Sequence, residues 1–216
     1  YADRIADNAP TISTTQVLHL YEPKGTLEGW KETMEFLNRP GQELFQYVMC
    51  ASAGSILMHK STVHAMLTHV WSKGSGLGKT TAMLAGASIW GHPKGQIMGE
   101  SDTDNAKMMQ GELNKNLPLF LDEITNMGGR ALSQLAYQFT GGSQKKRMKG
   151  SRNEFRHQGS DWKLLAVSTG NTSVVERISA IKAMPKAEAQ RVLEIRAERV
   201  FKEVSDKPLT DKFNRD

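Results

Sequence analysis

The sequence predicts an α/β fold in which helices flank a mostly parallel sheet, preceded by a small helical appendage. From about residue 62 onward, short apolar runs that end in glycine or acidic residues alternate with segments of helical spacing. Strands that alternate with helices in this way pair in parallel through crossover connections. We therefore assign residues 61–200 to an α/β core, 1–60 to a lead-in and helical appendage, and 201–216 to a C-terminal tail.

Two helices are expected in the appendage, after a polar and irregular lead-in over 1–25. The first follows the capping residue Thr26 and ends before Pro40, with apolar residues at helical spacing between them. The second spans 42–58, and its alanine, serine and glycine content indicates close packing against a neighbouring element.

The core elements follow from the spacing of apolar residues and from the glycines and prolines that interrupt them. The run 63–71 is apolar and ends at a glycine cluster, which is typical of a buried strand. In order along the chain we expect a strand over 63–71, a helix over 80–90, a strand over 96–98, a helix over 103–113, a strand over 117–121, a helix over 132–139 and a strand over 164–167.

The composition argues against a membrane-spanning protein and against a disulfide-stabilised one. The 216 residues have a mean hydropathy of −0.48, and no run approaches the roughly 18 apolar residues that a spanning helix needs. The single cysteine, Cys50, forms no internal disulfide, which fits a reducing cytoplasm, and its apolar neighbours predict a buried thiol. Because the first residue is Tyr1 rather than methionine, we expect a piece of a longer protein.

A glycine-rich loop follows the first core strand and precedes a helix. Its second half, 76–80, matches the phosphate-binding P-loop signature, although Lys73 stands where that signature begins with glycine. Lys79 is expected to reach the β- and γ-phosphates of ATP, and the Thr80 hydroxyl to ligate Mg²⁺. A glycine turn before an ordinary helix is the alternative. The predicted nucleotide-binding residues are Gly74, Ser75, Gly76, Leu77, Gly78, Lys79, Thr80 and Thr81.

Two polar strand ends accompany this loop. The apolar run before Asp122 and Glu123 predicts a buried parallel strand whose carboxyl end lies beside the loop. Asp122 would hold Mg²⁺ through water and Glu123 would take a proton from the attacking water, whereas a helix-capping pair is the alternative. The last expected strand runs into Asn171, our first candidate for a side chain that senses the γ-phosphate, with Thr169 next; a plain strand-end turn is the alternative.

Several short motifs occur in the order found in one known family. They are Gly78-Lys79-Thr80-Thr81, Thr103-Asp104-Asn105, Leu121-Asp122-Glu123-Ile124, Tyr137 to Gly142 and Ser168-Thr169-Gly170. Across roughly 25–195 the chain resembles the P-loop ATPases of phages and mobile elements that are catalogued as a bacterial domain of unknown function. Members are often joined to primase domains, and their core is similar to replicative and superfamily 3 helicases and to RecA-like and AAA+ motors.

The resemblance implies a hexameric ring whose active sites are shared between subunits, with a primase domain in the same or a partner chain. Such sites take an arginine from the neighbouring subunit to neutralise the γ-phosphate during hydrolysis. Arg191 is the first candidate because 190–195 falls where the family has its last core strand, although periodicity alone indicates a charged helix there. Arg177 and Arg130 are the other candidates, and a solvated or ion-paired side chain is the alternative for each.

The positive charge of the chain is concentrated in one segment. Lysine and arginine outnumber the acidic residues by 28 to 23, and residues 145–156, with six basic side chains and one acidic one, carry the whole excess. By the resemblance, this segment is a pore hairpin that contacts the phosphates of single-stranded or forked DNA. A charged surface loop, or a contact to a neighbouring subunit's nucleotide, is the alternative. The predicted nucleic-acid-binding residues are Lys145, Lys146, Arg147, Lys149 and Arg152.

Together these motifs favour an ATP-driven helicase or translocase module of phage or mobile-element DNA replication, located in the cytoplasm. An ATP-gated nucleic-acid-binding assembly or initiator protein that does not translocate is the main alternative. A P-loop kinase is less favoured, because Glu123 beside Asp122 suits the activation of water rather than transfer to a second substrate.

Overall fold

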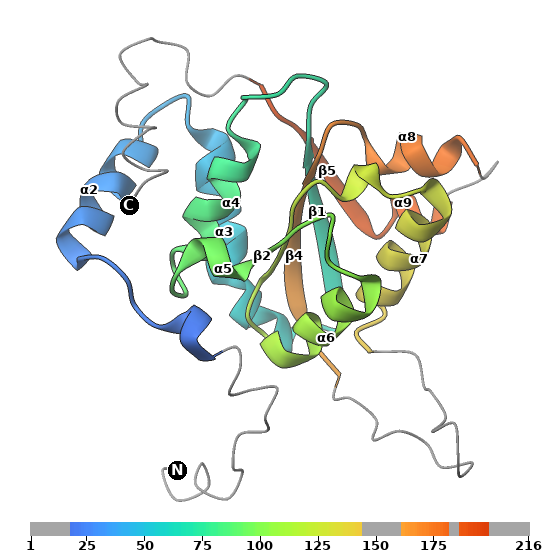
Figure 1. Cartoon of the computed structure of the whole chain (residues 1–216), viewed down its shortest axis with the longest axis horizontal. Helices are drawn as coiled ribbons and strands as arrows, with labels where there is room; N and C mark the ends of the chain where they lie inside the picture. The colour runs from blue at the N-terminus through green and yellow to red at the C-terminus, as the bar shows by residue number, and fades with distance from the viewer. Residues whose placement is uncertain (1–17, 144–160, 182–185, 199–216) are drawn as a thin grey trace, which may run out of the picture.

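The centre of the molecule is a five-stranded sheet in which every neighbouring pair of strands is parallel (Figure 1). The computed structural model describes residues 18–143, 161–181 and 186–198. The strand order is β2-β3-β4-β1-β5, which confirms the predicted α/β fold with a parallel sheet. The strands are β1 (Ala65–Trp71), β2 (Ile97–Met98), β3 (Leu119–Leu121), β4 (Leu164–Gly170) and β5 (Val192–Arg196).

Helices cover both faces of this sheet (Figure 1). One face carries α3 (Glu43–Gly54) and α4 (Lys79–Ala87), with α2 (Leu27–Leu37) on the outer side of α3 and the short α5 (Pro93–Gln96) beside α4 (Figure 1). The other face carries α6 (Asp104–Asn114), α7 (Gly129–Thr140) and α8 (Val174–Ser179), with the short α9 (Lys186–Ala189) beside α7 and β5. The 3₁₀ helices are η2 (His19–Tyr21), η3 (Ser55–Lys60) and η4 (Ile124–Asn126). Within the part of the chain that the structure describes, every helix is too short or too polar to cross a membrane.

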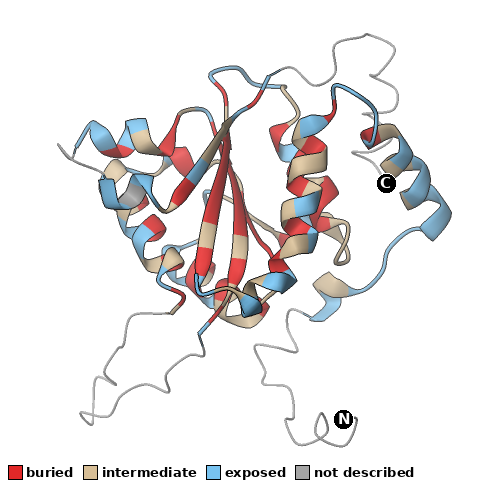
Figure 2. Ribbon diagram, turned by 180° about the vertical axis from the view of Figure 1, so that it is seen from behind, coloured by how far each residue is buried: buried red, intermediate tan, exposed pale blue. Residues whose placement is uncertain are grey.

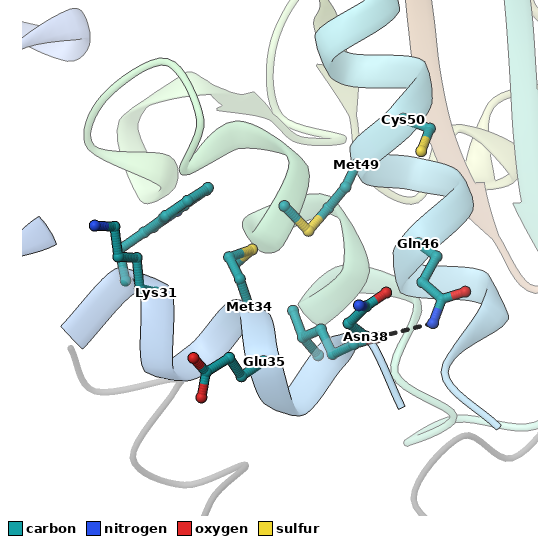
Figure 3. A pocket seen from close by; sticks show the side chains of 9 residues that line it. Lys31, Met34, Glu35, Asn38, Gln46, Met49 and Cys50 are labelled. Atoms are coloured by element: carbon teal, nitrogen blue, oxygen red, sulfur yellow. Dashed lines mark hydrogen bonds between the residues drawn. The ribbon is translucent and has the colours of Figure 1, made fainter. Parts of the chain in front are cut away.

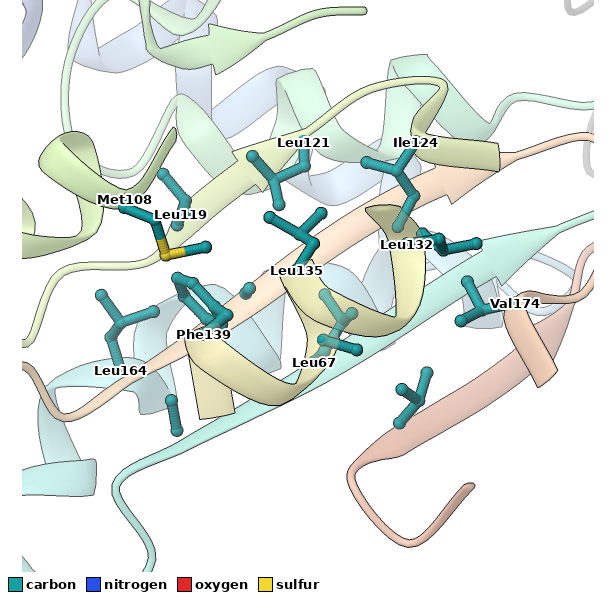
Figure 4. Close-up of a cluster of buried hydrophobic side chains, with 14 of the residues drawn as sticks. Leu67, Met108, Leu119, Leu121, Ile124, Leu132, Leu135, Phe139, Leu164 and Val174 are labelled. Carbon is teal, nitrogen blue, oxygen red and sulfur yellow. The ribbon is translucent and has the colours of Figure 1, made fainter. Parts of the chain in front are cut away.

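Strands β1, β3 and β4 are buried on both faces, so alternate side chains enter two separate apolar clusters. Leu119 and Leu121 of β3 pack with α7, whereas Phe120 between them packs with α3 and α4. Figure 4 shows the first cluster, in which Leu132 and Leu135 of α7 lie against the sheet. Figure 2 shows the buried residues in red along the strands and on the inner sides of the helices. Two-sided burial explains why the strand runs are apolar throughout rather than alternating.

The expected elements are present, with boundaries that differ by a few residues. The predicted helix 42–58 ends as an α-helix at Gly54 and continues as the 3₁₀ helix Ser55–Lys60. The segment Val192–Arg196 is a strand, so the helix that periodicity alone indicates at 190–195 is wrong. Pairing with β1 decides this conformation, because the preference for a strand depends on cross-strand contacts more than on the local pattern.

Helix α3 packs closely on α4, as its small residues predicted. The Ser52 hydroxyl donates to the Gly86 carbonyl at 2.7 Å. A Cβ atom at Gly86 would lie 3.0 Å from Val48 Cγ1 and 3.3 Å from Phe120, so only glycine fits without displacement of its neighbours. This contact fixes α4, and therefore the loop that precedes it, against the appendage.

The side chain of Cys50 is exposed, so the predicted buried thiol is wrong. Helix α3 buries Phe45, Val48 and Ser52, which recur every three or four residues on one face. Cys50 lies between them in sequence and faces the opposite side. There it borders a mainly apolar groove of about 620 Å³ between α2 and α3, shown in Figure 3. None of the predicted site residues lines this groove.

Candidate active site

The carboxyl ends of β1, β3 and β4 meet at one edge of the sheet, because these strands are parallel. Strand β1 leads into the glycine loop, β3 into Asp122 and Glu123 (the acidic pair), and β4 into Asn171. The structure thus brings the predicted loop, the acidic pair and the predicted sensor to one place. Strand β4 lies between β1 and β3, so its end, with Asn171, lies between the ends of the strands that lead into the loop and the acidic pair.

The glycine loop leaves its backbone N–H groups available for an anion. Gly76 and Gly78 have φ of +70° and +87°, a left-handed conformation that residues with side chains avoid. Among the described residues, the N–H groups of 74–78 donate to no backbone carbonyl, and 73–76 are exposed. Helix α4 begins directly after Gly78 and adds the positive end of its dipole. This donor set fits the phosphates of a nucleotide.

Lys73 occupies the first position of the P-loop signature without backbone strain. Its φ is negative, since Lys115 and Glu123 are the described non-glycine residues with positive φ. A side chain therefore meets no conformational penalty at Lys73. The departure from the signature leaves the loop conformation intact.

Lys79 lies at the start of α4 with 6% of its surface exposed. Its Nζ donates to Ser72 Oγ at 2.8 Å and to the Gly74 carbonyl at 3.1 Å. It also donates to Asn171 Oδ1 at 3.3 Å. Burial lowers the pKa of the Lys79 ammonium, and the carboxylates of the acidic pair oppose this effect. The cation is therefore held at the loop by neutral oxygens, which a phosphate can replace.

The predicted magnesium ligands, Thr80 and Asp122, lie together. Thr80 Oγ1 is 3.3 Å from Asp122 Oδ2 and 3.4 Å from Oδ1. The hydroxyl of Thr169, which is fully buried, donates to Asp122 Oδ1 and so fixes the carboxylate from within the sheet. Mg²⁺ prefers oxygen ligands and is usually shared between one or two carboxylates and substrate phosphates. Thr80 and Asp122 fit this pattern.

Asn171 bridges the two groups that are predicted to act in hydrolysis. Its Nδ2 donates to Glu123 Oε2 at 3.1 Å, and its Oδ1 accepts from Lys79 Nζ at 3.3 Å. This orientation of the amide places its oxygen toward the cation and its nitrogen toward the carboxylate. Lys79 and Glu123 are therefore linked through one side chain that is itself exposed at the edge of the sheet.

Glu123 is perturbed in both its backbone and its side chain. Its φ of 52° and ψ of 37° are left-handed, which costs roughly 1–2 kcal/mol for a residue with a side chain. Its N–H donates to Thr169 Oγ1 at 3.2 Å, which holds this conformation in place. Burial raises the pKa of the Glu123 carboxyl, Asp122 raises it further, and Lys79 acts in the opposite direction. Strain and a perturbed pKa thus coincide at the predicted general base.

Among the described residues, no hydrogen bond joins a candidate arginine to these groups. Arg191 precedes β5, at the opposite edge of the sheet, where its guanidinium stacks on Tyr137 at 4.3 Å and donates to the Ala187 carbonyl at 2.9 Å. Arg130 lies in the first turn of α7 and Arg177 in α8, and both are exposed.

The predicted nucleic-acid-binding residues, Lys145 to Arg152, lie outside the described residues. The two described ends of this segment lie side by side, because Trp162 N donates to the Gly142 carbonyl at 2.8 Å. Trp162 precedes β4, so both described ends of the segment lie at the amino ends of the strands, opposite the glycine loop.

Three polar residues near the candidate site are not predicted from the sequence: His69, Ser72 and Thr125. Ser72 Oγ accepts from Lys79, and Thr125 Oγ1 accepts from Asn171 N at 3.0 Å. His69 lies fully buried within β1, and a histidine inside an apolar strand is a signal that the sequence does contain. Thr125 gives no such signal, because its role depends on the distance between two strand ends.

The fold and the groups gathered at its edge define the class of protein, a P-loop NTPase-type α/β domain. Residues 5–159 match the family described as domain of unknown function DUF927, and the chain belongs to that family. No curated protein matches the chain.

Solved structures with a similar fold include a helicase. The SCCmec type IV Cch protein, described as an active helicase, aligns with a TM-score of 0.64 and 17% identity over 96% of this chain. The chain spans 38% of that helicase, and at this identity the likeness shows the fold alone. NtrX from Brucella abortus, in complex with ATP, aligns with a TM-score of 0.47 and 12% identity over 86% of this chain and 45% of its own.

Proposed function

We propose that the chain is an ATP-hydrolysing motor domain that works with Mg²⁺. The observation that carries this proposal is the Asn171 bridge, in which one amide contacts both the Lys79 ammonium and the Glu123 carboxylate. Lys79 lies at the phosphate-binding loop, so a phosphate that draws Lys79 away changes the contacts of Asn171. Asn171 is therefore suited to report the γ-phosphate to Glu123.

The residues of the site have distinct roles in this proposal. The N–H groups of 74–78 and the Lys79 ammonium bind the phosphates. When Mg²⁺ is bound at Thr80 and Asp122, it neutralises charge on the phosphates. Glu123 accepts a proton from the attacking water, and its raised pKa makes the carboxylate a stronger base than an ordinary glutamate.

The wider role concerns a longer protein, since the chain spans 38% of the helicase structure that it resembles. We place it as the helicase or translocase module of a phage or mobile-element DNA replication protein in the cytoplasm of the bacterial host. In this proposal the module forms a hexameric ring on single-stranded or forked DNA, with a primase domain in the same or a partner chain. Arg191 of one subunit serves the site of its neighbour.

The hydrolysis is tested by comparing Glu123→Gln with wild type. We expect Glu123→Gln to lower kcat at least about a hundredfold, because it removes the general base. ATP binding should be retained, since the loop is unchanged. Glu100→Gln is the matched control, because Glu100 accepts its hydrogen bond from Asn126 at 2.8 Å and acts on Glu123 through its charge alone, as the smallest of the causes that raise the pKa of Glu123. If Glu123→Gln hydrolyses ATP as fast as wild type, Glu123 is not the base.

The nucleic-acid partner is tested by adding single-stranded DNA to the ATPase assay. A translocating motor should hydrolyse ATP faster with DNA, whereas an ATP-gated assembly protein should not. The triple variant Lys145→Ala, Lys146→Ala, Arg147→Ala should bind DNA more weakly and with a shallower dependence on salt, because fewer counterions are released. Unchanged DNA binding and salt dependence would remove this segment from the proposal.

A further inference from the structure

The turn after β4, residues 170–173, carries Asn171 and so determines where its side chain lies. Its backbone is held from two sides. The Asn171 N–H donates to Thr125 Oγ1 at 3.0 Å, and His69 Nε2 lies 3.0 Å from the Thr172 carbonyl. The Thr172 hydroxyl is buried and has no partner among the described residues, so this side chain adds no anchor of its own.

His69 reaches this turn from the centre of β1, with both ring nitrogens engaged. A carbonyl only accepts, so Nε2 carries the proton and donates to Thr172. Nδ1 then accepts the single proton of the Ser168 hydroxyl at 3.0 Å, in place of the longer 3.3 Å bond from that hydroxyl to the Thr68 carbonyl. Burial lowers the pKa of His69, which favours the neutral ring that this arrangement requires. The ring therefore has one tautomer and one orientation.

Because Gly170 has no side chain, His69 and Thr125 can both approach the turn closely. A Cβ atom at Gly170 would overlap Thr125 Oγ1 and lie 2.9 Å from His69 Cε1, so no side chain fits between them. His69 belongs to the strand that leads into the glycine loop, and Thr125 follows the acidic pair by two residues. The turn is thus tied to both elements whose groups Asn171 bridges.

We propose that His69 is a positioning residue for hydrolysis. By donating to the Thr172 carbonyl, His69 holds the turn so that the Asn171 amide reaches both Lys79 and Glu123. This role rests on the proposed ATPase activity. The two bonds of Asn171 are 3.1 and 3.3 Å long, so a shift of the turn by roughly 1 Å breaks one of them. Nucleotide binding depends mainly on the N–H groups of 74–78, and the hydrogen bonds of the His69 ring in the described chain go to Ser168 and Thr172 instead. Loss of the His69 bond should therefore lower kcat and leave the KM for ATP nearly unchanged.

The test compares two substitutions of His69 in the full chain. A glutamine amide can place a donor near the position of Nε2, whereas an asparagine amide can replace only Nδ1. We expect His69→Asn to lower kcat about tenfold with a KM for ATP within about twofold of wild type. His69→Gln should restore most of the kcat. In an Asn171→Ala background, His69→Asn should cause no further loss, because both changes act through the same side chain.

Each outcome decides the role of His69. An equal loss of kcat in both backgrounds, or no loss in the wild-type background, overturns it. If His69→Asn does not fold, Ser168→Ala frees the ring instead and should lower kcat by about threefold only when Asn171 is present. Absence of ATP hydrolysis by wild type overturns the proposed function as well. If Glu123→Gln abolishes hydrolysis and His69→Asn leaves it unchanged, the proposed function stands and only the role of His69 is overturned.

Discussion

At the scale of single residues, Glu123 carries the most unusual chemistry in the described chain. Its backbone is left-handed, and burial together with the neighbouring Asp122 raises the pKa of its carboxyl above the ordinary value of 4.5. Lys79 opposes this rise but lies on the far side of the Asn171 amide. A general base acts only when deprotonated, so the raised pKa should be visible in the pH dependence of hydrolysis.

We expect the acid limb of the kcat–pH profile to lie above the range of an unperturbed glutamate. As the pH falls through the raised pKa, Glu123 gains a proton and kcat should fall about tenfold per pH unit. Asn171→Asp places a second negative group beside Glu123 and should move this limb to higher pH. Steady-state hydrolysis at saturating ATP, measured at a series of pH values, gives both limbs. A limb that Asn171→Asp does not move would belong to another group.

The same raised pKa predicts a gain in stability when the carboxylate is removed. The folded chain holds the Glu123 proton more tightly than the unfolded chain, so the stabilisation is present at low pH and lost as pH rises through the folded pKa. At neutral pH Glu123→Gln should therefore raise Tm, by roughly 1–3 °C. The difference should shrink below pH 4.5, where the carboxyl is protonated in both states. Thermal unfolding followed by circular dichroism at both pH values measures it, and a lower Tm at neutral pH contradicts the sign.

At the scale of elements, the contact between α3 and α4 should be sensitive to side-chain volume. Gly86→Val adds atoms within 3.0 Å of Val48 and 3.3 Å of Phe120, so we expect a loss of about 1–3 kcal/mol in the free energy of unfolding. Gly54→Ala is the control for adding a side chain to the same pair of helices without crowding, because a Cβ atom at Gly54 meets nothing within 4 Å. Gly54→Ala should be neutral or slightly stabilising. Urea denaturation measures both changes, and equal effects would mean that packing at Gly86 is not limiting.

The sequence predicts those features of the elements that depend on local pattern. Continuous apolar runs predicted the buried strands, and the parallel arrangement predicted that the loop, the acidic pair and Asn171 would meet at one edge. Strand β5 could not be predicted from periodicity, because its conformation comes from pairing with β1. The exposure of Cys50 escaped prediction because it depends on which face of α3 meets α4.

Within the candidate site, two of the three unpredicted residues have roles that depend on how the strands align. His69 lies opposite Ser168 in the pairing of β1 with β4, and this alignment places its ring beside the turn after β4. Thr125 reaches the same turn from the other side. Neither residue belongs to a short motif, so pattern alone does not connect them to Asn171.

At the scale of the whole molecule, the basic segment and Arg191 are the two features predicted to contact partners. Both meet the described core at the amino ends of the strands, opposite the glycine loop. The ends of the basic segment meet before β4, and Arg191 precedes β5. Strand β5 has 5 residues, so Arg191 lies roughly 16 Å along the sheet from the end that faces the loop. An arginine in this place does not reach the site of its own chain, although a second copy can bring its own site to it.

Mixing two inactive variants tests whether Arg191 acts between copies. Glu123→Gln lacks the base but keeps Arg191, and Arg191→Ala lacks the arginine but keeps the base. In an equal mixture of ring subunits, about a quarter of the interfaces combine an intact Glu123 with an intact Arg191 from the neighbour. We therefore expect ATPase activity to recover to about a quarter of wild type. A mixture that co-assembles on size-exclusion chromatography yet stays inactive would rule out Arg191 as the shared arginine, and Arg130→Ala and Arg177→Ala would then take its place in the same assay.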